Sequence, residues 1–558
     1  MHYNLVKASN RRYLEELKNR GHEMKPVYDA VNIMQETEWV VNKPVYEVIL
    51  ALINADSSMG NLPTNPQEIE LPVKPVDIET NKESLVAWKR KASLVYKDRA
   101  KQKSKYIQVR QILEEARLLL DRSFFYPLQM DFRGRIYPKP AMLSPQGADY
   151  SRALIKFKYG KQMKDNNSFD DFAIAGAGLY GEVDKEDIQT RLDWVKDRLD
   201  TFIGYAKEPL TNTDWRHADK PFCFLAWCFE LKDFAETDYD ASFITTLPIQ
   251  SDCSNSGLQH YSAMMRDEVG GKATNLIPSN KPEDVYRLVS IKVEQKLKDK
   301  PEPMAKQWLE YGIDRKLCKK PVMCLPYSLT QYSCRQYIQD HVEKEWKEKH
   351  KPHNFGTDLF KATNYLTPIV WESINEVIVG AKEIMGFLKK VSRLVASENL
   401  PVCWTTPKPL NFPVQMMCYK KESKRVKTKM GDSIIKLSIQ SDTDEIDKRK
   451  TAQSICPNLI HSLDASCLML AVIKAKDKGV TNFSLIHDSF GCVAPDVAKL
   501  SEAIREAFCE VYEQDVLTNW AMEMKQMLSE KNAKKFPLIP EKGNLDLSLV
   551  KQSIFFCV

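Results

Sequence analysis

Apolar residues in the first 125 positions follow the spacing of amphipathic helices. This spacing predicts helices over 85–96 and 107–121. A stretch rich in proline, asparagine and other polar residues, 57–75, separates the helical blocks and predicts a loop. We found no internal repeat and no low-complexity segment. The N-terminal part of the chain is therefore expected to be mainly helical.

The rest of the chain mixes the helical spacing with short strand-like runs. Residues 245–271 predict a strand, a turn and a helix that begins near Ser256 and stops at Gly270-Gly271. The spacing of apolar residues in 283–350 predicts helices, and the alternation of apolar and polar residues in 402–440 predicts strands. Residues 459–558 predict a helix, a hairpin and a further helix. The chain would thus leave a small sheet, form a long helical insertion and return. This order predicts an α+β fold that is mostly helical.

Two aspartates occupy the ends of the predicted strands. Asp252 closes the apolar run 245–252, and Asp488 lies in 483–491, an apolar run broken by a polar tip. Taken alone, each aspartate is typical of a turn or a helix cap. Taken together on adjacent strands, two carboxylates can bridge two divalent cations roughly 4 Å apart, which is the arrangement used for in-line attack on phosphate.

Composition and charge restrict the function only weakly. With 558 residues, the chain is longer than one compact domain usually is. It has 81 Lys and Arg residues and 75 Asp and Glu residues, so its net charge is only +6. The whole-chain charge therefore does not establish a nucleic-acid partner. Basic residues cluster locally at 89–105 and 420–429, and each cluster alone could be a solvated surface.

Thirteen cysteines are scattered without a repeated close pair, which predicts free thiols, a reducing compartment and no structural zinc. We identified no apolar run long enough to span a membrane, so a membrane partner is not expected. Residues 1–20 hold five basic and two acidic side chains and lack an apolar core. This pattern favours neither a secretory signal nor a mitochondrial transit peptide.

Four sequence blocks in order resemble one protein family. They are Asp-Phe-Arg-Gly-Arg-Ile-Tyr at 131–137, the Asp252 block through 271, the basic block 314–327, and 457–462 followed by the Asp488 segment. Each block is weak alone, but together they closely resemble the single-subunit DNA-directed RNA polymerases of bacteriophages and mitochondria, the phage branch most. The resemblance runs from about residue 28 to the C-terminus.

The resemblance implies a right-hand polymerase fold with palm, fingers and thumb. The expected parts are a short N-terminal helical segment (1–75), thumb-like helices (76–121), the first part of the palm (122–280), fingers with a promoter-hairpin-like insertion at 405–440 (281–458), and the second part of the palm (459–558). The basic stretch 415–440 occupies the place of the family's promoter-reading hairpin. Its residues do not align well enough to assign base contacts.

The resemblance also implies roles for individual residues. Asp252 and Asp488 would hold two Mg²⁺ ions, with the backbone carbonyl of Cys253 as an extra ligand. Lys319 would act in catalysis and, with Arg315, bind the triphosphate, where an ammonium group and a forked guanidinium both suit phosphate oxygens.

Tyr327 would select ribose over deoxyribose, helped by His461 near the 2′-hydroxyl, and Tyr286 would lie near the nucleotide. Pro321 and Pro326 depart from the family pattern, and they predict either a helix start near Pro321 or a kink just before Tyr327. Ser328 stands where glycine is common in the family. The residues expected to contact nucleic acid are Arg133, Arg135 and Arg152.

The expected partners are a DNA template, an RNA product and ribonucleoside triphosphates. Family members carry a promoter-binding N-terminal domain, whereas the resemblance here begins near residue 28. A companion subunit or a single-stranded-DNA-binding activator is therefore expected, and a phage-encoded chain would act in the bacterial cytoplasm. One alternative is a family A DNA polymerase, although Ser489 stands where that family has glutamate. Another is an inactive nucleic-acid-binding relative.

Overall fold

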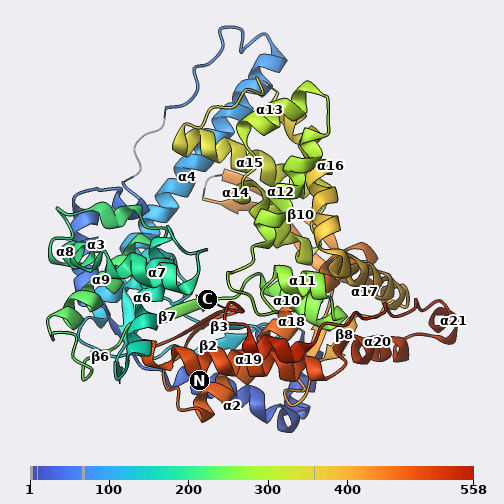
Figure 1. The fold of residues 1–558 in the computed structure, drawn as a ribbon. Coiled ribbons are helices and arrows are strands. Elements are labelled where there is room, and N and C mark those ends of the chain that lie inside the picture. The colour runs from blue at the N-terminus through green and yellow to red at the C-terminus, as the bar shows by residue number, and fades with distance from the viewer. Residues whose placement is uncertain (1–3, 9, 66–69, 357, 432, 558) are drawn as a thin grey trace.

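The computed structural model describes residues 4–8, 10–65, 70–356, 358–431 and 433–557 (Figure 1). The predicted α+β, mostly helical fold is confirmed. Four helices fill the N-terminal part: α1 (Arg11–Asn19), α2 (Lys25–Gln35), α3 (Lys43–Asn54) and α4 (Lys82–Leu119).

A small antiparallel sheet holds both aspartate segments. Its strands are β7 (Ile249–Asp252), β12 (Ser484–Ile486) and β13 (Ser489–Cys492), in the order β12-β13-β7. Ser489 of β13 is directly opposite Asp252 of β7. The two strands predicted from distant parts of the chain are therefore neighbours, as expected.

The long helix α18 (Lys448–Asp477) forms the centre of the hydrophobic core. It packs against α2, α10 (Ser256–Met265), α17 (Val379–Ser397) and α19 (Val497–Glu513). With 30 residues, this helix is long and apolar enough to cross a membrane. The expectation that the sequence holds no apolar run of that length is therefore wrong. In its most apolar stretch of 18 residues, 83% is buried inside the protein, so α18 is a core helix.

Two groups of helices lie on opposite sides of β7 (Figure 1). One group is α5 (Asp149–Ala153), α6 (Asn166–Tyr180), α7 (Ile188–Lys196), α8 (Leu199–Lys207) and α9 (Pro221–Ala235). It packs around buried aromatic rings, with Phe224 stacked on Trp227 at 5.6 Å between ring centroids. The other is α12 (Val285–Lys298), α13 (Pro303–Tyr311), α14 (Arg315–Cys324), α15 (Gln331–Lys349) and α16 (Leu359–Val377).

Helix α4 is one continuous helix of 38 residues, whereas the sequence predicted two shorter ones. The Lys-, Arg-, Gln- and Ala-rich segment between the two predicted helices has strong helix formers but no apolar stripe, so periodicity did not mark it. Asn81 caps the N-terminus by accepting hydrogen bonds from two backbone N–H groups. Apart from Ala92, only the C-terminal half of α4 is buried, through Val109, Ile112, Leu113 and Ala116.

The predicted helix from Ser256 to Gly270-Gly271 is in fact two helices. Helix α10 ends at Met265, and Arg266 adopts a left-handed conformation with φ 53°. A separate helix, α11 (Glu268–Ala273), then contains both glycines. Asp267 caps α11 by accepting hydrogen bonds from two of its backbone N–H groups, so a strong N-cap there overrides the glycines as a stop signal.

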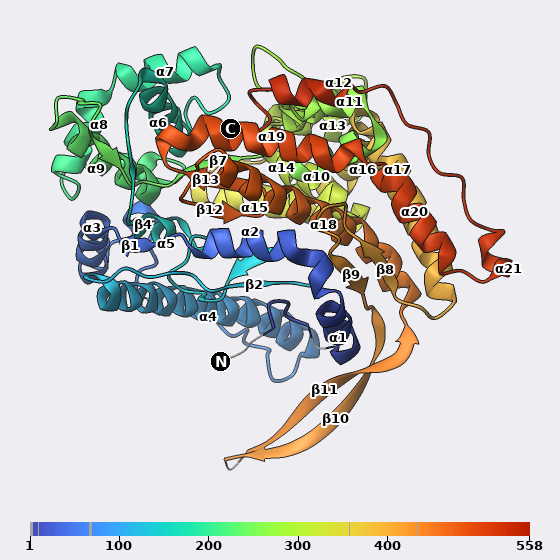
Figure 2. The ribbon, with the colours of Figure 1, turned by 90° about the horizontal axis from the view of Figure 1, so that it is seen from below.

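Two further hairpins follow α17. Strands β8 (Val402–Thr405) and β9 (Pro413–Met416) pair near the core, and β10 (Tyr419–Met430) pairs with β11 (Ser433–Ile446). Figure 2 shows the β10–β11 hairpin projecting from the body of the protein. The stretch predicted at 415–440 therefore covers β10 and the first part of β11, and its basic residues at 420–429 lie on β10.

Cys253 and Cys557 form a disulfide across 304 residues of sequence. The prediction of free thiols throughout is wrong for this pair, because only the fold brings the C-terminus beside β7. The other eleven cysteines are free, and eight of them are buried.

Candidate active site

Asp252 and Asp488 lie next to each other at one edge of the small sheet. Asp252 is the last residue of β7, and Asp488 is in the two-residue turn between β12 and β13. His487 in that turn has φ 54°, and the backbone N–H of Cys253 donates to the carbonyl oxygen of Asp488 at 3.0 Å. The hairpin predicted around Asp488 is therefore present, and a backbone hydrogen bond ties it directly to the residue after Asp252.

The two carboxylates have different surroundings. Burial, with the nearby Asp464 carboxylate as a second cause, raises the pKa of Asp488 to about 6. The hydroxyl of Ser256 donates to Oδ2 of Asp488 at 3.1 Å. Asp252 is exposed, and the ammonium group of Lys220 lies 3.6 Å from its Oδ2. One carboxylate is thus half-buried beside another acidic side chain, and the other is exposed and open to a ligand.

This donor set fits Mg²⁺. Within the part of the chain that the structure describes, no group of three or more His, Cys, Asp or Glu side chains is placed to hold a metal. Mg²⁺ is commonly bound by one or two carboxylates together with water and substrate phosphates, so two aspartates and the Cys253 carbonyl are a suitable oxygen set. A cation there would also compensate the charge of the half-buried Asp488.

The basic block forms α14, but the helix ends before Tyr327. Pro321 lies inside α14, which stops at Cys324, and residues Leu325–Tyr327 form a 3-10 turn. Of the two predicted alternatives, the break just before Tyr327 is correct. Ser328 has φ 65°, a left-handed conformation that explains why glycine would suit this position.

Arg315 is held by an acidic residue that the sequence analysis did not single out. Its Nε donates to Oδ2 of Asp284, and its guanidinium lies 5.2 Å from the centre of the Tyr286 ring. Asp284 also caps α12 by accepting from the backbone N–H of Tyr286 at 2.9 Å. Arg315 and Tyr286, both predicted to bind substrate, are therefore fixed against each other.

Lys319 is exposed one helical turn after Arg315. Partial burial of its ammonium group lowers its pKa, and the positive charges of Arg315 and Lys185 lower it further. Three cations gathered at one place are a suitable arrangement for binding a polyphosphate, although Arg315 is also paired with Asp284. Lys185, on the loop before α7, was not predicted, because no motif surrounds it.

Tyr327 and His461 face each other with ring centroids 5.0 Å apart. Burial, and then the charges of Arg135 and Arg133, lower the pKa of His461 to about 2, so the ring is neutral. Nδ1 of His461 lies 2.6 Å from a guanidinium nitrogen of Arg133, which can only donate. Nδ1 is thus the acceptor, and the other ring nitrogen carries the proton and is a hydrogen-bond donor.

A close approach between helices places the Tyr327 hydroxyl. A Cβ added at Gly257 of α10 would lie 3.0 Å from Pro326 and 3.3 Å from the Tyr327 hydroxyl. Burial raises the pKa of Tyr327 to about 12, so its hydroxyl stays protonated. A neutral tyrosine hydroxyl and a neutral imidazole donor therefore meet beside the two aspartates.

The arginines predicted to contact nucleic acid already bind carboxylates. Arg133 pairs with Asp131 at 2.5 Å, and Arg135 pairs with the buried Asp464 at 2.5 Å. Gly134 between them has φ 94°, which favours glycine. Arg152 lies apart on α5, and its buried Nε has no hydrogen-bond partner among the described residues. Contacts of these three arginines with nucleic acid stay a prediction.

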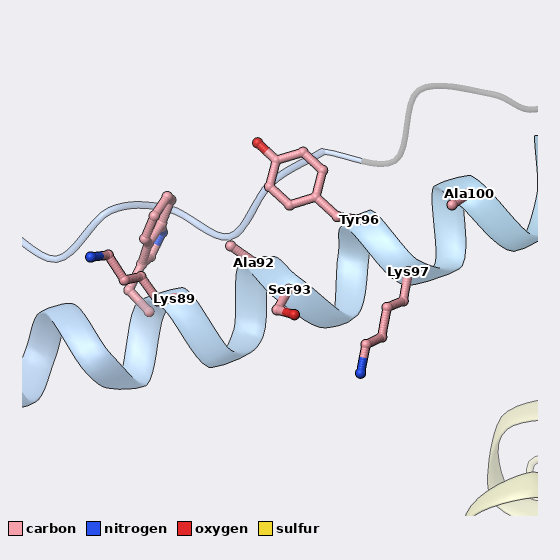
Figure 3. Close-up of a pocket in the computed structure, with 7 residues that line it drawn as sticks. Lys89, Ala92, Ser93, Tyr96, Lys97 and Ala100 are labelled. Carbon is pink, nitrogen blue, oxygen red and sulfur yellow. The ribbon is translucent and has the colours of Figure 1, made fainter. Parts of the chain in front are cut away.

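The exposed half of α4 carries the first basic cluster. A shallow cavity of about 390 Å³ on this helix is lined by Trp88, Lys89, Ala92, Ser93, Tyr96, Lys97 and Ala100. Figure 3 shows Tyr96 pointing toward a neighbouring segment of the chain and Lys97 pointing away from it. The cluster is thus a solvated basic surface that an anionic partner could reach.

Comparisons with known proteins agree with this geometry. A family model described as DNA-dependent RNA polymerase matches residues 162–537. The DNA-directed RNA polymerase of Enterobacteria phage T3 and T7 RNA polymerase of Escherichia phage T7 are each 34% identical over 95% of this chain. The DNA-directed RNA polymerase 2 of Arabidopsis thaliana, chloroplastic/mitochondrial, is 33% identical over 96% of it.

The chain belongs to the DNA-dependent RNA polymerase family. It spans 64% of the length of the two phage relatives and 52% of the plant relative. Its α+β architecture is that of the single-subunit RNA polymerases. The division at 75, 121, 280 and 458 into N-terminal segment, thumb, palm and fingers stays a prediction.

Several residues that shape this candidate active site escaped the sequence analysis. They are Lys185, Lys220, Ser256, Asp284 and Asp464. Asp464 follows His461 by one helical turn on α18, and this spacing could have found it. The two lysines lie outside any motif, so only the fold reveals them.

Proposed function

We propose that this chain transfers ribonucleotides to an RNA 3′ end under the direction of a DNA template, using two Mg²⁺ ions. The observation that carries the proposal is the pairing of β7 with β13, which brings Asp252 and Asp488 together. Two Mg²⁺ ions bound there would activate the 3′-hydroxyl and neutralise charge on the leaving pyrophosphate. The natural substrates would be ribonucleoside triphosphates, and phage genes would be the templates.

The protein's own residues would position the substrates. Arg315 and Lys319 would bind the triphosphate, since phosphoryl transfer depends mainly on positioning and charge neutralisation. The Tyr327 hydroxyl, next to the donor nitrogen of His461, would recognise the ribose. Lys220 would keep the Asp252 carboxylate paired until a divalent ion replaces it.

The direct test is extension of an RNA primer on a preformed RNA–DNA scaffold with Mg²⁺. We expect stepwise addition of ribonucleotides and poor addition of deoxynucleotides. Preferred use of deoxynucleotides would favour the alternative, a family A DNA polymerase. Scaffold binding without any extension would favour an inactive relative.

Arg315→Lys is expected to raise the KM for every ribonucleotide roughly tenfold with a smaller change in kcat. Lysine keeps the charge, but it loses the forked contact and the stacking on Tyr286, and a charge-assisted hydrogen bond contributes about 1.5 kcal/mol or more. Single-nucleotide addition measured at varied substrate concentration checks this. Arg287→Lys, an exposed change on α12, is the matched control. An unchanged KM would contradict a triphosphate role for Arg315.

We further propose that a companion subunit or a single-stranded-DNA-binding activator assists initiation in the bacterial cytoplasm. The relatives hold residues beyond the 64% of their length that this chain matches. Opening a duplex costs roughly 1.4 kcal/mol per base-pair step, so promoter melting needs compensating contacts.

The 558-residue chain alone is therefore expected to start RNA on single-stranded or pre-melted DNA and to start poorly on linear duplex DNA. Run-off assays on a duplex, the same duplex with a melted bubble, and a single strand check this expectation. Efficient, sequence-specific starts on the linear duplex would contradict it. Such starts would instead indicate that the β10–β11 hairpin is sufficient for promoter recognition.

A further inference from the structure

The C-terminal segment packs directly against the turn that follows Asp252. Cys253 and Cys557 form an antiparallel bridge as well as a disulfide. The backbone N–H of Ser254 donates to the carbonyl of Phe556 at 3.4 Å, and the Ser254 hydroxyl donates to that of Phe555 at 3.3 Å. The C-terminal residues therefore line the free side of β7, beside the three-stranded sheet.

Cys253 is held from two sides. Its backbone N–H binds the carbonyl of Asp488, and its side chain binds Cys557. The stretch that carries Asp252 and the Cys253 carbonyl is thus fixed between the Asp488 hairpin and the C-terminal segment. A change in the C-terminal segment can reach both expected metal ligands through this one residue.

Noncovalent contacts also hold the C-terminal segment against the protein. Phe555 and Phe556 are 1% and 2% exposed, and the amide of Gln259 donates to the Phe556 carbonyl at 3.0 Å. The Ser553 hydroxyl donates to the carbonyl of Asn275 at 2.7 Å. Chain ends fray unless they are tied down, and here the disulfide adds a covalent tie to these contacts.

We propose that Cys253–Cys557 is a reversible thiol–disulfide site whose oxidised form holds the catalytic turn in its working geometry. A low-molecular-weight thiol or dithiol is the reactant. Its thiolate attacks Sγ of Cys253, the half-buried partner, and a second thiolate completes the exchange. The sulfur–sulfur bond breaks, the two cysteines gain two electrons and two protons as thiols, and the reactant leaves as its own disulfide. The oxidised form of the same reactant reverses the exchange.

Peptide mapping of the full chain, alkylated under denaturing conditions, tests whether the bond exists. We expect a crosslinked pair of peptides containing Cys253 and Cys557, which dithiothreitol separates. We also expect amide hydrogen exchange over 553–557 to rise about tenfold after reduction, since the terminal segment then opens locally. Cys557→Ser should show the fast exchange with or without dithiothreitol. Cys403→Ser, a half-buried free cysteine on β8, should behave like the wild type.

The effect on catalysis rests on the proposed function and is measured separately. In primer extension, dithiothreitol should raise the Mg²⁺ concentration for half-maximal rate several-fold in the wild type and leave Cys557→Ser unchanged. Free thiols at both positions without reductant, or equal responses of wild type and Cys557→Ser, would overturn the proposal. If neither redox form extends a primer, the proposed function fails, whereas mapping and exchange still decide whether the disulfide fixes the C-terminus.

Discussion

Asp252→Asn and Asp488→Asn are each expected to lower the rate of nucleotide addition by at least about a thousandfold. Asparagine keeps the size of the side chain but removes the negative charge that holds a divalent cation. Losing several kcal/mol of transition-state stabilisation corresponds to a loss of this order. Affinity for the RNA–DNA scaffold should stay close to that of the wild type, because phosphate contacts come mainly from lysine and arginine. Single-turnover extension and scaffold binding measure the two effects.

The two variants also separate catalysis from folding. The Asp488 carboxylate is half-buried near Asp464, so the neutral amide should leave the free energy of unfolding equal to or above that of the wild type. Asp299→Asn, an exposed change at the C-terminal end of α12, is the matched control and should extend primers normally. Near-normal extension by either active-site variant would refute the assignment of the metal ligands.

Tyr327→Phe is expected to raise the use of deoxynucleotides relative to ribonucleotides by roughly tenfold or more. A site that hydrogen-bonds a hydroxyl discriminates against the analogue that lacks it, and each such bond contributes about 1 kcal/mol or more. Phenylalanine keeps the ring that contacts His461, so the rate with ribonucleotides should change little. Competition between ribo- and deoxynucleotides at one template position measures the ratio.

The same experiment can locate the discriminating group. Tyr332→Phe removes an exposed hydroxyl on α15 and should leave the ratio unchanged. If Tyr327→Phe also leaves it unchanged, selection lies with another group. His461 is then the first candidate, because its neutral ring presents a donor beside Tyr327.

The sequence alone determined those parts of the site that depend on short stretches of chain. The strand before Asp252, the hairpin around Asp488 and the helix that carries Arg315 and Lys319 follow from local periodicity and turn chemistry. The proline pair predicted either a helix start near Pro321 or a break just before Tyr327, and the break is present. Local periodicity did not predict that α4 is one continuous helix. The segment that joins its two predicted parts is rich in strong helix formers but has no apolar stripe.

Only the tertiary structure decided how distant residues combine. The contact of Arg133 with His461 joins positions 328 residues apart, and the disulfide joins Cys253 to Cys557 across 304. The pairs Arg135–Asp464 and Arg315–Asp284 likewise come from different elements. Periodicity tells which face of a helix or strand is buried, but it does not tell which element packs against that face. These partners are set by the packing of α18, the small sheet and the C-terminal segment around one core, and that packing fixes the charge and the rigidity of the site.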